Sequence, residues 1–168
     1  ATAAASSSQN QSKYEANVAN VASVAGKMDN RVIAAYQQLG FKLVVDPSVN
    51  YSGYFDARSR SITMKQIDDS VYHELGHFLA FIAGNADKTA SFQSIFAAEK
   101  ANVTAFNKAY VTQNASEYFA ESVKDYILNN ASLKSTRPQT YAAVQNALNQ
   151  ITDAQIAKIQ KIYGAFWN

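Results

Sequence analysis

The residues best suited to chemistry are His73, Glu74 and His77, which form an H-E-x-x-H pattern. They include both histidines of the chain, so the two imidazoles lie at a single spacing. On a helix, residues four positions apart share a face, and two histidines so placed can bind one metal ion. Glu74 projects to the side, where it reaches a water at the metal but not the metal itself. The pattern therefore predicts one zinc ion and peptide-bond hydrolysis, with Glu74 as general base.

A third metal ligand has to come from elsewhere in the chain, because a catalytic zinc site usually has three protein ligands and one open position. There is no cysteine and no further histidine, so the third ligand should be a carboxylate. Glu117 is the favoured candidate, and Glu99, an acid of the intervening helix, is the alternative. Glu121 lies one turn after Glu117 and can accept the free N–H of a ligating histidine; which histidine stays open. The simpler alternative is that these are surface residues forming i,i+4 pairs.

The elements that must position these residues are mostly helical. Apolar periodicity and end signals predict helices at residues 14–24, 28–39, 68–83, 89–103, 114–128, 138–148 and 152–163. Short β-branched and aromatic runs predict strands at residues 41–45, 54–55 and 61–64. The expected fold class is α+β and mostly α-helical, with a small antiparallel or mixed sheet packed against the H-E-x-x-H helix and a helical C-terminal half. Residues 1–12 are expected to form a flexible tail, and residues 13–168 a single domain.

Gly76 stands out inside the H-E-x-x-H helix, because an internal glycine costs up to about 1 kcal/mol relative to alanine. One explanation is that a substrate or other close neighbour needs the space. The other is that a packed helix needs a small residue there. The sequence alone leaves both explanations open.

The composition excludes several classes of function. A net charge of +2 with no basic run argues against nucleic-acid binding, and no apolar run is long enough to cross a bilayer. The lack of cysteine excludes disulfides and thiolate metal sites. The small, polar residues 1–9 fit either the remnant after a signal-peptide cleavage or a terminus of any other origin. Nothing suggests an assembly larger than a monomer.

Several separate motifs resemble one known family. They are Y-H-E-L-G-H at 72–77, S-F-Q-S-I-F at 91–96 with Glu99, Tyr110, E-Y-F-A-E-S at 117–122, and P-Q-T-Y at 138–141. Together they are similar to the catalytic domain of anthrax toxin lethal factor, and closer still to the small secreted Pro-Pro endopeptidases built on that domain. The resemblance extends from about residue 61 to residue 148.

The resemblance implies a secreted bacterial, gluzincin-like zinc endopeptidase that binds its peptide or protein substrate in extended form. It implies His73, His77 and Glu117 as ligands of one Zn²⁺ and Glu74 as base. It adds Tyr110 as a phenol that hydrogen-bonds the oxyanion, and Glu121 as the support of a ligating histidine. It further suggests that one strand forms the edge to which a substrate adds, namely Ser61, Ile62, Thr63 and Met64.

Two departures leave the cleavage preference open. Ser116 stands where the Pro-Pro endopeptidases have an acidic residue, and the segment 46–60 is short and lacks the tryptophan of their longer loop. Tyr51, Tyr54 and Phe55 either line the cleft instead or pack within the sheet. Three alternatives remain: a non-catalytic binding module on a metallopeptidase-like fold, a protease specific for one host protein, and a structural protein without metal.

Overall fold

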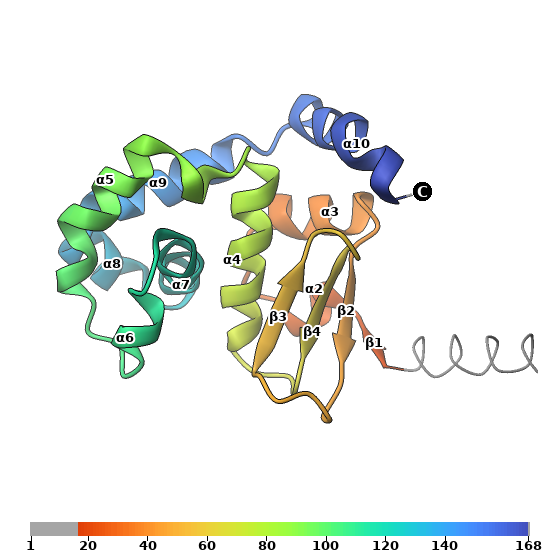
Figure 1. Ribbon diagram of the computed structural model, residues 1–168, viewed down its shortest axis with the longest axis horizontal. Coiled ribbons are helices and arrows are strands. Elements are labelled where there is room, and N and C mark those ends of the chain that lie inside the picture. The colour runs from red at the N-terminus through yellow and green to blue at the C-terminus, as the bar shows by residue number, and fades with distance from the viewer. Residues whose placement is uncertain (1–16, 168) are drawn as a thin grey trace, which may run out of the picture.

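The computed structural model describes residues 17–167 and shows a mixed α+β fold in which a small sheet and a group of helices lie on opposite sides of one central helix (Figure 1). The four strands are β1 (Val18–Ala19), β2 (Lys42–Val45), β3 (Gly53–Asp56) and β4 (Ser61–Met64). The helices are α2 (Val21–Val24), α3 (Asn30–Gln38), α4 (Ser70–Ile82), α5 (Ala90–Glu99), α6 (Lys108–Val111), α7 (Ala115–Leu128), α8 (Asn130–Thr136), α9 (Pro138–Asn149) and α10 (Asp153–Trp167), with 3-10 turns η1 (Ala86–Lys88) and η2 (Lys100–Asn102).

The sheet is mixed, with the strand order β1-β2-β4-β3. β2 and β4 are parallel, with Leu43 opposite Ile62, while β1 and β3 pair antiparallel on the two sides. The prediction that Ser61, Ile62, Thr63 and Met64 form the sheet edge is therefore wrong. The turn after Asp56 brings β4 back antiparallel along β3, so within residues 17–167 the outer strands are β1 and β3, and β4 lies between β2 and β3.

Apart from the first, the predicted helices begin within two residues of their expected positions, but α5 ends at Glu99, before the predicted residue 103, and α10 continues past residue 163. Asn114 caps α7 by accepting from the backbone N–H of Glu117 at 2.8 Å, and Thr89 caps α5 by accepting from Phe92 at 3.1 Å. Gly40, with φ of 78°, ends the segment of α3. The predicted helix at 14–24 is wrong in its middle, because Val18 pairs with Val44 in the sheet.

The hydrophobic core has two parts, one on each side of α4. An aromatic cluster that includes Phe41, Phe55 and Phe78 fills the space between the sheet and α4, and Trp167 from α10 closes it by packing on Phe41. On the other side, α4 packs along α7. The helix α4, which carries the H-E-x-x-H residues, is thus buried between the sheet and α7, and both contacts fix its orientation.

The expected tail at residues 1–12 lies outside the described residues, and the single domain at 13–168 stays a prediction. Within residues 17–167, no helix has both the length and the apolar composition that crossing a bilayer requires.

Candidate metal centre

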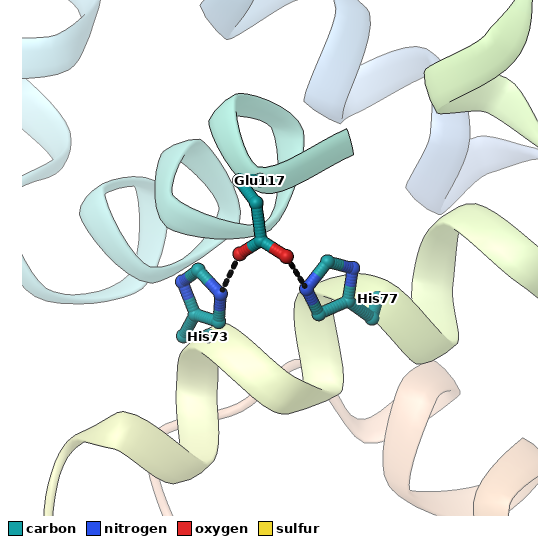
Figure 2. Close-up of side chains that lie close together, drawn as sticks. All are labelled: His73, His77 and Glu117. Atoms are coloured by element: carbon teal, nitrogen blue, oxygen red, sulfur yellow. Dashed lines mark hydrogen bonds and ion pairs between the residues drawn. The ribbon is translucent and has the colours of Figure 1, made fainter. Parts of the chain in front are cut away.

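His73, His77 and Glu117 converge at the contact between α4 and α7 (Figure 2). One ligand atom from each lies within 4.8 Å of the others. The Nε2 of His73 is 2.9 Å from one carboxylate oxygen of Glu117, and the Nε2 of His77 is 3.4 Å from the other. The carboxylate therefore lies between two imidazole nitrogens that point toward it from successive turns of α4.

Gly76 explains how the two helices come close enough. A Cβ added at Gly76 would lie 2.6 Å from the carbonyl oxygen and 2.7 Å from the Cα of Ala120. Gly76 lies between the two histidines in sequence, and Ala120 lies between Glu117 and Glu121. Contact of the two backbones at this point thus brings both acids alongside both histidines. Of the two explanations that the sequence left open, the structure supports the packed helix.

Glu121 contacts the far side of His73. Its Oε2 is 2.7 Å from the Nδ1 of His73, and its Oε1 is 3.5 Å from the Nζ of Lys124. The histidine that Glu121 supports is therefore His73. A carboxylate behind a ligating histidine fixes the ring and its tautomer and leaves Nε2 free to bind.

The donor set fits a metal ion. A neutral imidazole carries one N–H, yet both ring nitrogens of the buried His73 face carboxylate oxygens. If Nδ1 of a neutral His73 donates to Glu121, Nε2 and the oxygen of Glu117 are both acceptors, so either a second proton on the ring or a metal ion lies between them. Two imidazoles and one carboxylate are a donor set that Zn²⁺ takes in catalytic sites.

The pKa values of His73 and Glu117 likewise indicate that the site favours a positive charge. Burial would lower the pKa of His73, but the hydrogen bonds to Glu117 and Glu121 outweigh it and raise this pKa to about 9. Burial would likewise raise the pKa of Glu117, yet the hydrogen bonds to His73 and His77 hold it far below its usual range. The cluster therefore stabilises positive charge on the imidazole side, which in a zinc protein the metal supplies.

Glu74 lies beside this group and is nearly inaccessible, with 7% of its surface exposed. Burial raises the pKa of Glu74, and the neighbouring histidines oppose the shift. Tyr110 faces the group from α6, with its ring centroid 6.5 Å from that of His73 and its hydroxyl hydrogen-bonded to Glu117. Burial also raises the pKa of Tyr110, so the phenol keeps its proton at neutral pH.

His73, Glu74, Tyr110 and Glu121 line a cleft of about 390 Å³. The wall opposite Tyr110 is the start of β3, with Tyr51, Ser52 and Gly53. Tyr51 and Tyr54 keep exposed rings whose centroids are 5.8 Å apart, whereas Phe55 packs in the core against Phe78. Tyr51 is thus available to a ligand of the cleft, whereas Tyr54, between Gly53 and Phe55 on β3, projects to the other face of the strand and does not line the cleft.

Glu99, the alternative third ligand, has a different structural role. Its carboxylate accepts from the backbone N–H groups of Gln139 and Thr140 and from the Thr140 hydroxyl, so it caps the first turn of α9. Asp87 was not expected to matter, but it is buried and accepts a 2.7 Å hydrogen bond from Ser116, next to Glu117. No sequence pattern indicated that contact.

Gly53 is a further residue that sequence reasoning did not single out, although glycine within a strand can mark a close approach. A Cβ there would lie 2.8 Å from the Cγ of Glu74 and 3.0 Å from the Sδ of Met64. Gly53→Ala should therefore displace the Glu74 side chain. We expect kcat/KM for peptide hydrolysis to fall roughly tenfold to a hundredfold, with a loss of about 1 kcal/mol in unfolding free energy.

Gly26→Ala is the matched control, since its Cβ would meet nothing closer than 3.9 Å. Steady-state kinetics and thermal unfolding of both variants check the prediction. Wild-type kcat/KM in Gly53→Ala would show that Glu74 does not depend on this space.

The chain belongs to the family described as "Anthrax toxin lethal factor, N- and C-terminal domain", which matches residues 57–147, more than half of its length. The match contains all the residues of the metal centre. Among curated proteins, the Pro-Pro endopeptidase of Clostridioides difficile (strain 630) is 41% identical over 78 residues. That alignment covers 44% of this chain and 34% of the relative, so the chain aligns with only about a third of that protein. The resemblance seen in the motifs is thereby confirmed.

Proposed function

We propose that this chain is a zinc-dependent endopeptidase that hydrolyses peptide bonds in an extended peptide or protein substrate. The single observation that carries the proposal is the convergence of His73, His77 and Glu117 beside the buried Glu74, with His73 and Glu74 lining a cleft. His73, His77 and Glu117 would hold the ion. Bound zinc would supply Lewis-acid polarisation of the substrate carbonyl and would lower the pKa of water.

The chain's own residues would carry the proton transfers. Glu74 accepts a proton from the attacking water and passes it to the amine that leaves, and its raised pKa suits both steps. Tyr110 donates its hydroxyl proton in a hydrogen bond to the carbonyl oxygen as negative charge develops there. Glu121 holds the His73 ring in place throughout.

The exposed edge beside the cleft suggests how the substrate binds. β3 begins at Gly53 on the cleft wall, and within residues 17–167 its outer side has no partner strand. An extended peptide that adds to β3 would run past Glu74 with its backbone hydrogen-bonded. Tyr51 then offers an aromatic face in the cleft, which favours proline-containing segments. A monomer exported from a bacterial cell is part of this proposal, supported by the family resemblance.

The test is digestion of a mixed peptide library, rich in proline-containing members, by the zinc-loaded chain, with mass-spectrometric mapping of the new termini. We expect cleavage at a defined set of internal bonds, which excess chelator abolishes and added zinc restores. Loaded protein that binds peptides yet cuts none would indicate a binding module instead. Cleavage of only one folded protein and of no short peptide would indicate a single-substrate protease.

Tyr110→Phe removes only the proposed oxyanion donor. A lost donor of this kind costs about 2.7–4 kcal/mol in the transition state, so we expect kcat to fall roughly a hundredfold or more while zinc stays bound. Tyr141→Phe is the control, because its hydroxyl lies away from the cleft and contacts Asn130. An unchanged kcat in Tyr110→Phe would remove Tyr110 from the mechanism. Measurement of the zinc content and kcat of both variants tests this prediction.

A further inference from the structure

A second hollow lies next to the substrate cleft. This hollow, of about 480 Å³, shares Asn107, Glu121 and Lys124 with the cleft, so the two are neighbours on either side of these residues. Its floor comes from the second half of α7 and from α8, and its rim from the loop between η2 and α6. The second hollow is therefore the next surface that a substrate extending past Lys124 would meet.

Phe106 stands on the rim of this hollow with its side chain in solvent, at 108% relative exposure. The loop that carries it is anchored. Val103 is buried in the core, the N–H of Lys108 bonds to the carbonyl of Ala105, and the Lys108 amine bonds to the carbonyl of Ala101 at 2.8 Å. The Phe106 ring thus contributes no stabilisation through burial in the folded chain, and its anchored loop holds it at a fixed position.

The charges in the hollow are already paired. Lys124 contacts Glu121, and the buried Arg137 is 2.5 Å from Asp125. The rest of the lining is largely uncharged and includes amide and hydroxyl side chains such as Asn102, Asn129 and Thr136. Such a lining can satisfy a peptide backbone but does not favour a charged side chain. The one large apolar surface on offer is Phe106.

We propose that Phe106 is a specificity-determining residue, which packs against an aromatic or aliphatic side chain of a substrate that extends from the cleft into the second hollow. This inference rests on the proposed peptidase function. Contact with the substrate would bury an apolar ring that the folded chain leaves exposed. The preference for an apolar residue would lie several positions from the cleaved bond, because the hollow lies beyond Lys124.

The experiment compares Phe106→Ala with the wild-type chain on a peptide identified by library digestion, synthesised at full length and trimmed one residue at a time from either end. Phe166→Ala is the matched control, an exposed phenylalanine on α10. We expect Phe106→Ala to lower kcat/KM about tenfold on long peptides that carry an apolar residue at the distal position, mainly through KM. The loss should shrink as trimming from one end removes that residue, and Phe166→Ala should match the wild type on every peptide.

Three results would overturn the inference. One is an effect below twofold on every peptide from a wild-type chain that cleaves them, which leaves the peptidase function standing. Another is an equal loss at every length with a lowered Tm, which would show a structural role. The third is a zinc-loaded wild-type chain that cleaves nothing, which removes the proposed function and this inference with it.

Discussion

Replacing Glu74 by glutamine is expected to abolish peptide hydrolysis while zinc remains bound. Glu74 is not one of the residues whose ligand atoms converge, so its replacement leaves His73, His77 and Glu117 together. General acid–base catalysis contributes about 10²–10⁴-fold, and here one carboxylate serves both proton transfers. We therefore expect kcat/KM to fall by about 10³-fold or more, at unchanged zinc stoichiometry.

Zinc analysis and discontinuous peptide assays on the same preparation check this prediction. Asp153→Asn is the control, an exposed acid at the start of α10. Glutamine is nearly isosteric with glutamate, so the contact with Gly53 is kept. Hydrolysis by Glu74→Gln at a rate near that of the wild type would mean that another group moves the protons.

Gly76→Ala is expected to destabilise the protein strongly, against what helix propensity alone predicts. Alanine inside a helix is better than glycine by up to about 1 kcal/mol. At this position the new methyl group would lie 2.6 Å from the carbonyl oxygen of Ala120, which is backbone and cannot turn aside. Forced overpacking costs about 1–3 kcal/mol, and here it separates α4 from α7. We expect a net loss of about 2 kcal/mol and weaker zinc binding, because Glu117 moves with α7.

Gly164→Ala offers a sharp comparison, since Gly164 is also inside a helix but has only the Gln160 side chain nearby, at 3.7 Å. That variant should gain up to about 1 kcal/mol. Urea unfolding of both variants without metal, followed by zinc titration, separates stability from metal affinity. A gain in both variants would mean that the helices do not pack as closely as the structure shows.

Long elements with strong local signals could be predicted from the sequence. α4, α5, α7 and α9 each carry an apolar stripe, and polar caps or Pro138 mark where they begin. Elements that depend on distant partners could not. β1 has two residues and is a strand because it pairs with β2, and α6 and α8 have too few residues to show a period. α10 continues beyond its predicted end because Trp167 packs on Phe41 and donates to the carbonyl of Ala57 at 3.0 Å.

The same division applies to the site. The grouping of His73, His77 and Glu117 could be expected, because helical spacing and the chemistry of zinc restrict the choices to a few acids. That these residues bind zinc remains a prediction. The order of the strands could not be predicted from local patterns. The proposed substrate edge is therefore β3, not the predicted β4. Gly53, Asp87 and Phe106 owe their interest to neighbours far away in sequence, which no local pattern encodes.

Thr152 and Gln155 have the residue types and spacing of a capping box at the start of α10, but the structure forms only half of it, for a similar reason. The N–H of Gln155 bonds to the Thr152 hydroxyl at 3.1 Å, as a capping box requires. The Gln155 side chain does not return to Thr152 but donates to the carbonyl of Ile82 at 2.8 Å. A tertiary contact thus took the place of a local one and tied α10 to the end of α4.

The most direct measurement of the central claim is the zinc content of the purified chain, by inductively coupled plasma mass spectrometry after dialysis against one equivalent of zinc and then metal-free buffer. We expect one zinc per chain in the wild type and in Glu99→Gln, whose carboxylate caps α9, and almost none in Glu117→Ala. Circular dichroism confirms that each variant is folded. A folded wild-type chain without zinc, or a Glu117→Ala chain that retains it while Glu99→Gln loses it, would contradict the account.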